Sequence, residues 1–305
     1  MAQPTYGGLP PTRDGVGPSC VALPSADWRL LIDFLAHRFP AIPREVWTQR
    51  MAQGAVLDAA GMPLPCTTAY RSQSKIYYYR SLSDEAPIPF EASILFQDET
   101  LIVCDKPHFL PVIPSGRYLQ QTLLVRLKRQ LGIETLAPVH RIDRETAGLV
   151  LFTVTTGARA AFQALFRERQ VHKTYHAIAR WRPELSFPIE VQNRLEDAEA
   201  FMQMRVVDGI PNAATTIDVE SVQGDLARYR LCPRTGQRHQ LRVQMAALGM
   251  PILNDRIYPI LLPELAQNAA PDYSNPLQLL ARSIEFIDPI TGQSRHFESR
   301  LRLQF

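Results

Sequence analysis

The stretch HRIDRETAGLVLF, from His140 to Phe152, joins a dense group of charged residues to an apolar run. Five of the eight residues in AGLVLFTV, residues 147–154, are large and apolar. A short run of this kind is typical of a buried strand. The charged residues before it are therefore expected in a loop at the edge of a sheet, where a rigid scaffold often holds functional side chains. These residues are His140, Arg141, Asp143 and Arg144.

Strand and helix patterns alternate along the rest of this region without a regular rhythm. Apolar alternation predicts strands within 93–107, 172–180, 215–222 and 227–232. Helical spacing predicts helices over 123–132, 155–170 and 236–249, the second with Thr155 or Thr156 as N-cap and the third closed by Gly249. Because no βαβ repeat is visible, we expect a mixed α+β core.

The N-terminal part of the chain predicts a separate module. Residues 1–24 are rich in Pro and Gly and read as a flexible tail. Helices are expected over Asp27–Phe39 and Pro43–Gly54, followed by a strand, a tight turn and another strand. These elements define a module over 25–88, and the Pro-containing stretch near residue 88 links it to a larger domain over 89–305.

Composition bounds the class of protein. With 305 residues, 46% of them hydrophobic, the chain can bury a sizeable core. Its four cysteines, at positions 20, 66, 104 and 232, have no spacing typical of metal or redox motifs. Neither a signal peptide nor a membrane span is apparent. We therefore expect a cytoplasmic protein that does not bind membranes.

Charge is unevenly spread along the chain, although the net charge is only +3. Residues 101–182 hold 13 basic and 5 acidic side chains, residues 183–227 hold 2 and 9, and residues 228–256 hold 6 and 1. Most of the basic residues are arginines, which suit phosphate contacts and stacking on bases. This pattern indicates a polyanionic partner, although an ordinary solvated face has the same composition.

Asp143 is the first candidate for chemistry. A carboxylate flanked by arginines stays ionised at neutral pH, which suits a nucleophile or a stabiliser of positive charge rather than a general acid. A surface turn with a local Asp–Arg pair is the alternative, and the residues alone favour it slightly.

Two further segments carry candidate residues. In RTGQRHQLRV, Arg238 and Arg242 would share one face of a helix and could hold phosphates or a carboxylate. In HKTYHAIA, Lys173 and Tyr175 point the same way along a strand, and Tyr175 offers a ring for stacking and a hydroxyl. An ordinary basic helix face and an ordinary strand tyrosine are the respective alternatives. The apolar side of the helix, Leu241, Met245 and Leu248, is expected to pack on the core.

Together the three segments resemble the motifs of the pseudouridine synthases of the RluA family. HRIDRETAGL resembles the family's H-R-L-D-x-x-T-S-G-L, Lys173 and Tyr175 match its K-x-Y, and TGQRHQLRVQ resembles T-G-R-[TS]-H-Q-[IL]-R-V-H. The stretches DETLIVCDKPHFLPV, LGMPILNDRIY and PLQLLARSIEFIDPITG also resemble family motifs in the same order. The likeness covers about residues 90–305.

The resemblance implies a fold, an activity and roles. It implies a mixed, largely antiparallel sheet flanked by helices, and site-specific isomerisation of uridine to pseudouridine in structured ribosomal or transfer RNA. Asp143 falls on the catalytic aspartate, Tyr175 on the active-site tyrosine, and Arg242 on the arginine that pairs with the aspartate. No metal or organic cofactor is implied, and a monomer is expected. RNA contacts are expected from His140, Arg141, Arg144, Lys173, Arg238, His239 and Gln240.

Departures from the family motifs concern RNA contacts more than chemistry. Gln237 and Arg238 stand where the family has Arg and Thr or Ser, so a phosphate contact is expected to have moved by one residue. The residues Met250, Asn254 and Pro259 replace the family's His, Gly and Gly. These changes put the RNA target in question and indicate a divergent branch.

The N-terminal module resembles the small RNA-binding domain named after ribosomal protein S four, which follows the same plan of two helices, G-x-V and a turn. Residues 1–88 hold 8 basic and 7 acidic side chains, so the basic surface is thin. The module is either a true RNA-binding copy or a degenerate copy that only packs on the larger domain.

Two rival functions are compatible with parts of the pattern. One is an RNA-binding protein of the same fold without catalysis, but such a protein need not keep Asp143, Tyr175 and Arg242 together. The other is a glycoside hydrolase acting on free nucleosides or sugars, which normally uses two carboxylates. Only Glu145 is close to Asp143 in sequence, and the excess of arginine favours RNA.

Overall fold

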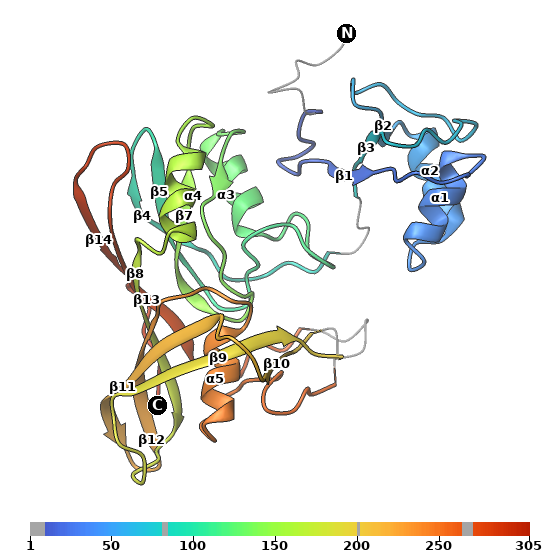
Figure 1. Cartoon of the computed structure of the whole chain (residues 1–305). Coiled ribbons are helices and arrows are strands. Elements are labelled where there is room, and N and C mark those ends of the chain that lie inside the picture. Colours follow the sequence, from blue (N-terminus) through green and yellow to red (C-terminus); the bar gives the residue numbers. More distant parts are fainter. Residues whose placement is uncertain (1–9, 81–84, 200–201, 264–270) are drawn as a thin grey trace. The chain divides into compact units, whose positions relative to one another are not determined.

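The computed structural model in Figure 1 describes residues 10–80, 85–199, 202–263 and 271–305. The chain divides into two compact units, each described here by itself. The small unit comprises residues 1–85 and 114–134, and the large unit comprises 86–113 and 135–305. The chain passes from the small unit to the large one between residues 85 and 86, and residues 114–134 return to the small unit.

The small unit contains two helices and a three-stranded antiparallel sheet. The helices are α1 (Leu31–Arg38) and α2 (Arg44–Ala52), and the strands β1 (Ser19–Ala22), β2 (Val56–Leu57) and β3 (Lys75–Tyr78) lie in the order β1-β3-β2. Its apolar core includes the fully buried Leu35 and Trp47. The expected tail over 1–24 is corrected for residues 19–22, which form β1 because their backbone pairs with β3. Residues 1–9 of that tail lie outside the described residues.

The third helix, α3 (Leu123–Leu131), belongs to the small unit although the sequence assigned it to the larger domain. Val125 packs in a buried cluster with Val16 and Leu119. The Glu85 carboxylate accepts hydrogen bonds of 2.7–2.8 Å from the backbone of residues 119–121. These contacts join segments distant in sequence, which local periodicity does not reveal.

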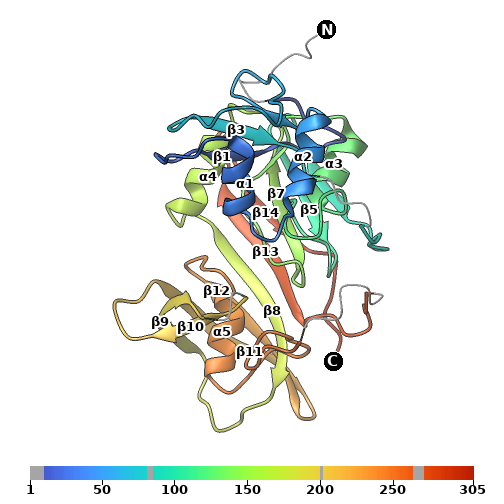
Figure 2. The ribbon, with the colours of Figure 1, turned by 90° about the vertical axis from the view of Figure 1, so that its right-hand side faces the viewer.

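The large unit is built on one mixed sheet, which Figures 1 and 2 show from two sides. Its main strand order is β10-β9-β11-β12-β8-β13-β7-β5-β4, with β14 paired to β13 and β6 to β7. Only the pairing of β13 with β7 is parallel among the described strands, so the expected mixed, largely antiparallel sheet is confirmed. The strands are β4 (Ser93–Gln97), β5 (Leu101–Lys106), β6 (Ala137–Pro138), β7 (Ala147–Thr153), β8 (His172–Arg180), β9 (Ile189–Asp197), β10 (Met204–Val207), β11 (Ala213–Gln223), β12 (Leu226–Pro233), β13 (Leu279–Ile287) and β14 (Ser294–Glu298).

Strand β7 is the buried strand that the opening stretch predicts, and all seven of its residues are buried. It pairs with β5 on one side and β13 on the other. Gly148 has a φ of 108°, and a Cβ there would lie 2.3 Å from the carbonyl oxygen of Ala281 in β13. Only glycine permits this approach, so the sequence just after the charged loop is fixed by strand packing.

Helix α4 (Arg159–Arg167) begins later than expected. Its N-cap residue is Ala158, whose side chain makes no capping hydrogen bond, rather than Thr155 or Thr156. The Thr156 carbonyl instead accepts a hydrogen bond from the Arg159 backbone N–H, forming a turn before the helix. Helix α4 packs Phe162 and Leu165 into the cluster that includes β7.

Helix α5 (Gln240–Ala247) is shorter than the predicted helix over 236–249. Its N-cap residue, His239, has a left-handed φ of 54°, so Arg238 lies before the helix and does not share a face with Arg242. Leu241 and Met245 pack in the large core as expected, with Leu248 beside them. Gly249, with φ 73°, ends the turn after the helix.

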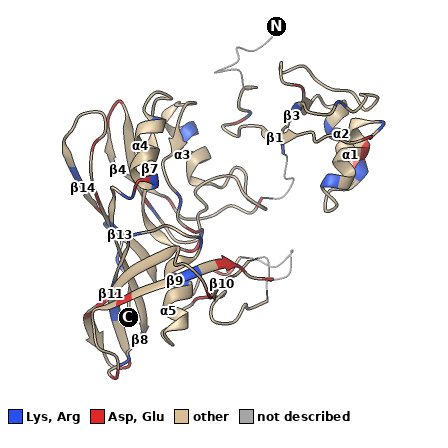
Figure 3. Ribbon diagram, viewed as in Figure 1, with Lys and Arg blue, Asp and Glu red and all other residues tan. Residues whose placement is uncertain are grey.

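The acidic segment 183–227 pairs internally with the basic segment 228–256. Figure 3 shows blue and red residues along β9 and β11, and several of them form ion pairs. Part of the basic charge that indicated a polyanionic partner is therefore neutralised by ion pairs within the fold. The pairs are Arg230–Asp218 at 2.6 Å, Arg234–Glu190 at 3.1 Å and Arg238–Asp197 at 2.7 Å.

The described part of the chain has three general features that bear on membranes, disulfides and metals. No helix there is long and apolar enough to cross a membrane. All four cysteines are free thiols. The described residues contain no group of three or more His, Cys, Asp or Glu side chains that could hold a metal ion.

Candidate active site

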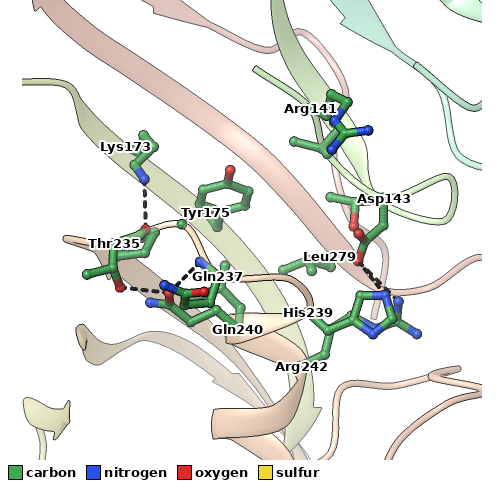
Figure 4. A pocket seen from close by; sticks show the side chains of 15 residues that line it. Arg141, Asp143, Lys173, Tyr175, Thr235, Gln237, His239, Gln240, Arg242 and Leu279 are labelled. Carbon is green, nitrogen blue, oxygen red and sulfur yellow. Dashed lines mark hydrogen bonds and ion pairs between the residues drawn. The ribbon is translucent and has the colours of Figure 1, made fainter. Parts of the chain in front are cut away.

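A pocket in the large unit lies where the loop before β7, strand β8 and the start of α5 meet (Figure 4). It holds about 530 Å³ of empty space, including its open mouth. Seven of the ten residues proposed from the sequence line it, and His140, Arg144 and Arg238 do not. The lining residues are Arg141, Ile142, Asp143, Thr146, Lys173, Tyr175, Pro233, Thr235, Gly236, Gln237, His239, Gln240, Leu241, Arg242 and Leu279.

Asp143 and Arg242 meet in this pocket although they are 99 residues apart in sequence. Arg242 Nη1 donates a hydrogen bond of 3.2 Å to Asp143 Oδ2. The Arg242 side chain is 2% exposed and the Asp143 side chain 27% exposed. The carboxylate is therefore open to the pocket while its cationic partner is buried behind it.

Asp255 is a second carboxylate on Arg242, and sequence reasoning did not single it out. Arg242 Nε donates to Asp255 Oδ2 at 2.8 Å, and Nη2 donates to Oδ1 at 2.6 Å. Burial alone would lower the pKa of Arg242, but the hydrogen bonds and charge of Asp255, and then the charge of Asp143, raise it. Arg242 therefore stays charged. Asp255 lies within LGMPILNDRIY, where its match to the aspartate of the family motif was the available signal.

His239 is a further side chain that lies close to the Asp143 carboxylate. Its Nε2 lies 3.8 Å from Asp143 Oδ2, and its Nδ1 is 3.0 Å from the Tyr258 hydroxyl. Burial lowers the pKa of His239, and the nearby Asp143 charge only partly offsets this effect. The ring is therefore mainly neutral at pH 7, and its left-handed backbone directs it toward the pocket.

Tyr175 and Lys173 reach the same pocket from β8. Burial, reinforced by the charge of Asp143, raises the pKa of Tyr175, so its hydroxyl stays protonated at neutral pH. Lys173 Nζ donates a hydrogen bond of 2.9 Å to the Thr235 carbonyl, and burial lowers the pKa of Lys173 to about 8. Both side chains line the pocket from the same face of β8, as the two-residue spacing predicted, and Figure 4 shows Lys173 reaching toward Thr235.

The side-chain amide of Gln240 joins neighbouring segments of the protein through hydrogen bonds. Its Oε1 accepts hydrogen bonds from Thr235 Oγ1 at 2.7 Å and from the Gln237 backbone at 3.1 Å. Its Nε2 donates to the Ala214 carbonyl at 3.1 Å and to Thr215 Oγ1 at 2.9 Å. Both ends of the amide are therefore occupied and Gln240 shapes the pocket wall, while its expected RNA contact stays a prediction.

His140 also has a role inside the protein. Its Nε2 accepts a hydrogen bond of 3.2 Å from the Leu151 backbone, and its ring stacks on Phe166 with centroids 4.6 Å apart. Burial, with a smaller contribution from Lys173, lowers the pKa of His140 to about 3. The neutral ring therefore holds the loop against β7, and the expected contact of His140 with RNA stays a prediction.

Arg144 and Arg238 lie outside the pocket lining. Arg144 Nε donates to Glu145 Oε1 at 2.8 Å. Arg238 is exposed and bonds Asp197 at 2.7 Å and the Gln203 carbonyl at 3.2 Å. Because the helix is short, the Arg238 side chain lies outside the pocket and faces β9, and its expected phosphate contact stays a prediction.

Lys106 is a buried residue that sequence reasoning did not assign. Its Nζ donates to the carbonyls of Pro107 at 3.0 Å and Arg144 at 3.2 Å. Burial lowers the pKa of Lys106 to about 7, although the charges of Glu145 and Asp143 partly counter this. The side chain ties the loop that carries Asp143 to the end of β5.

The arrangement combines an open carboxylate, a buried guanidinium and a protonated phenol around one pocket. Such a carboxylate can attack an electrophilic carbon, take a proton or stabilise positive charge that develops beside it. The phenol can donate a hydrogen bond, and its ring offers a surface for stacking. The pocket therefore holds groups that can serve nucleophilic, acid–base or electrostatic catalysis.

The chain is similar in sequence to known proteins. Residues 100–247 match the family model described as RNA pseudouridylate synthase. An uncharacterized RNA pseudouridine synthase from Synechocystis sp. is 31% identical over 237 residues, covering 75% of this chain and 79% of that protein. The dual-specificity RNA pseudouridine synthase RluA of Yersinia pestis is 32% identical over 219 residues, covering 67% of this chain and 97% of that protein.

A solved structure supports the same assignment. Human RNA pseudouridylate synthase domain containing 4 has a TM-score of 0.53 and 27% sequence identity, and the match covers 68% of this chain and 88% of that one. The fold, the family model and the relatives therefore converge on one activity. This chain belongs to the RluA family of RNA pseudouridine synthases, the enzymes that convert uridine in RNA to pseudouridine.

Proposed function

We propose that this enzyme isomerises specific uridines in folded ribosomal or transfer RNA, with Asp143 as the reacting carboxylate. One observation carries the proposal: Asp143 Oδ2 bonds the buried Arg242 at 3.2 Å while the carboxylate lines the same pocket as Tyr175. We expect the enzyme to act as a cytoplasmic monomer without a metal or organic cofactor.

The proposed reaction moves one bond of the ribose. The bond from C1′ to uracil N1 breaks, and its electrons leave with N1 as positive charge develops on the sugar. Asp143 either attacks C1′ or removes a sugar proton at this stage. After the base has turned, C5 bonds to C1′ as the bond from C1′ to Asp143 breaks or, in the other route, as Asp143 returns the proton to the sugar. The C5 proton is then lost, and N1 ends protonated.

Tyr175 and Arg242 would support this step in different ways. A uridine inside folded RNA must be swung out of its stack, and the Tyr175 ring provides a surface for the displaced base. The hydroxyl of Tyr175 would also aid loss of the C5 proton. Arg242 would keep Asp143 directed at the sugar, because its guanidinium is buried and bonds the carboxylate from behind the pocket.

RNA contacts are proposed for the cations and polar groups that border the pocket. Arg141 is exposed at the pocket edge, and Lys173 lies on its wall. Both can approach phosphates next to the target uridine. His239 would contact the ribose side of the bound nucleotide, because its Nε2 lies 3.8 Å from Asp143.

The small unit is proposed to contribute a second RNA contact. Its elements follow the plan of the small RNA-binding domain named after ribosomal protein S four: two helices, then a short strand, a turn and a second strand. Glu substitutions at Arg38 and Arg44, both exposed on the helices, are expected to weaken RNA binding several-fold and to make its salt dependence shallower. Unchanged affinity in the double variant would show that the unit does not contribute through these helices.

Mapping of pseudouridine in total RNA tests the main proposal. Deletion of the gene is expected to remove pseudouridine at one or a few positions, and the wild-type gene should restore it. The Asp143→Asn variant should restore none of it. Asp218→Asn is a matched control, because Asp218 lies on β11 and pairs with Arg230 away from the pocket lining. Full restoration by Asp143→Asn would contradict the assignment, and an unchanged map after deletion would favour an RNA-binding role.

A further inference from the structure

We propose that Asp255 is a positioning residue that fixes Arg242 and offsets its charge, so that Asp143 remains an available carboxylate. This inference rests on the proposed role of Asp143. It concerns a residue that lies outside the pocket lining.

Arg242 is held by Asp255 much more firmly than by Asp143. Two of its nitrogens, Nε and Nη2, bond Asp255 at 2.8 and 2.6 Å, which is the paired geometry that guanidinium and carboxylate favour. One nitrogen, Nη1, reaches Asp143 at 3.2 Å. The orientation of the guanidinium is therefore set by Asp255, and Asp143 receives the one direction that remains.

Asp255 is itself fixed by the backbone. Its Oδ1 accepts hydrogen bonds from the backbone N–H of Ile257 at 2.8 Å and of Tyr258 at 3.1 Å. Its side chain is only 1% exposed. A buried carboxylate with these partners cannot move away from Arg242 without losing several hydrogen bonds, so it is a rigid support.

The charges explain why two carboxylates are needed. A buried guanidinium that faced Asp143 alone would attract that carboxylate strongly and weaken it as a nucleophile or base. Asp255 already balances the charge of Arg242, so Asp143 experiences a nearly neutral pair rather than a full cation. Asp143 is then aimed by one hydrogen bond while its own charge stays available to the sugar.

The segment that follows Asp255 supports a second neighbour of Asp143. The Tyr258 hydroxyl accepts a hydrogen bond of 2.7 Å from the Met204 backbone and contacts His239 Nδ1 at 3.0 Å. His239 Nε2 faces the same oxygen, Asp143 Oδ2, that bonds Arg242. Residues 255–258 therefore support both groups that face this oxygen.

The test is the Asp255→Asn variant of the full chain, assayed on RNA from the deletion strain at a mapped uridine. Loss of the ionic hold on Arg242 is expected to lower kcat about 10²-fold, with KM nearly unchanged, because a small misplacement of a reacting group has this effect. With Asp255 neutral, Arg242 attracts Asp143 more strongly. The acid limb of the pH–rate profile should therefore move to lower pH, which a purely structural role would not produce.

Three comparisons make the result decisive. Asp218→Asn should leave kcat and the acid limb unchanged. Asp143→Asn should be inactive; activity there would overturn the proposed function and this inference with it. An inactive Asp143→Asn beside an Asp255→Asn variant with wild-type kcat and an unmoved acid limb would overturn the role of Asp255 alone.

A charge-preserving variant keeps the test available if Asp255→Asn fails to fold. Asp255→Glu retains the negative charge but adds a methylene group, so the two-bond geometry with Arg242 is lost. We expect a reduced kcat with the acid limb at its wild-type position. If the folded Asp255→Glu variant kept the wild-type kcat, the two-bond geometry between residue 255 and Arg242 would not be needed for catalysis.

Discussion

Arg242 and Lys173 line the same pocket, but their surroundings have opposite effects on them (Figure 4). Arg242 contacts two carboxylates, which raise its pKa despite burial. Lys173 has a carbonyl as its hydrogen-bond partner, and burial lowers its pKa to about 8. One cation is permanently charged and held in place, whereas the other can lose its charge close to neutral pH.

The difference separates two kinds of cationic site in one pocket. Carboxylates offset the cost of burying the Arg242 charge, and the result is a rigid group that can orient Asp143. The carbonyl of Thr235 offsets that cost only partly for Lys173, whose charge becomes complete when an anion such as an RNA phosphate approaches. We therefore expect the Arg242 side to govern chemistry and the Lys173 side to govern binding.

Removal of Arg242 is expected to have the largest effect. In Arg242→Met, the buried Asp255 carboxylate loses its cation, which should lower the free energy of unfolding of the large unit by about 3–5 kcal/mol. Activity should be undetectable, because Asp143 loses its partner. Native-state hydrogen exchange of peptides from β7 and α5 measures the stability.

Arg230→Met is the matched control for this loss. Arg230 bonds Asp218 at 2.6 Å, but its side chain is 52% exposed. An exposed ion pair of this kind contributes less than about 1 kcal/mol. Similar destabilisation in the two variants would mean that burial does not distinguish the Arg242 pair.

Tyr175→Phe tests the group that shares β8 with Lys173 and faces Asp143. The variant keeps the ring for stacking but removes the hydroxyl, so we expect kcat to fall about 10²-fold with RNA affinity retained. Single-turnover assays and binding titrations separate these effects. A loss of affinity with kcat unchanged would place Tyr175 on the binding side of the pocket.

Lys173 should give the enzyme a pH-dependent RNA affinity. Raising the pH through about 8 removes its charge, so wild-type affinity should fall several-fold between pH 7 and pH 9 at constant salt. Lys173→Arg should remove this step, and Lys173→Met should bind weakly at both pH values. If the Lys173→Arg variant showed the same fall in affinity between pH 7 and pH 9, the titrating group would have to be another residue.

The lowered pKa of Lys173 also makes the free energy of unfolding increase with pH. Its pKa is lower in the folded state than the unfolded value of 10.5, so the unfolded chain binds more protons between about pH 8 and 10.5. The cost of burying the charged amine is present below pH 8 and is relieved as the pH rises through this window. Lys173→Met should lack this rise when unfolding is measured against pH.

Tyr258→Phe is expected to have the smallest effect. It removes the hydroxyl that contacts His239 and Met204 but leaves Arg242 with both carboxylates. Loss of hydrogen bonds worth about 1 kcal/mol predicts a roughly fivefold lower kcat. A loss as large as that expected for Asp255→Asn would shift the main support of Asp143 from Arg242 to His239.

The local sequence pattern was sufficient to predict the strands but not the residues at which the helices begin and end. Strand β7 and the paired directions of Lys173 and Tyr175 follow from apolar runs and from the two-residue period of a strand. The start of α5 could not be predicted from the local sequence, because the left-handed backbone of His239 is stabilised by contacts in the pocket rather than by a local capping signal. The proposed Arg238–Arg242 face was wrong for this reason.

The sequence by itself determined the type of sheet, the loop that carries Asp143, and a family likeness that includes Tyr175 and Arg242. These features depend on short-range periodicity and on residue identities in fixed order. Only the tertiary structure decided that Asp255 shares Arg242, that His140 and Gln240 are used inside the protein, and that residues 114–134 join the small unit. Such contacts join segments far apart in sequence, and burial gives them their strength, so no local pattern encodes them.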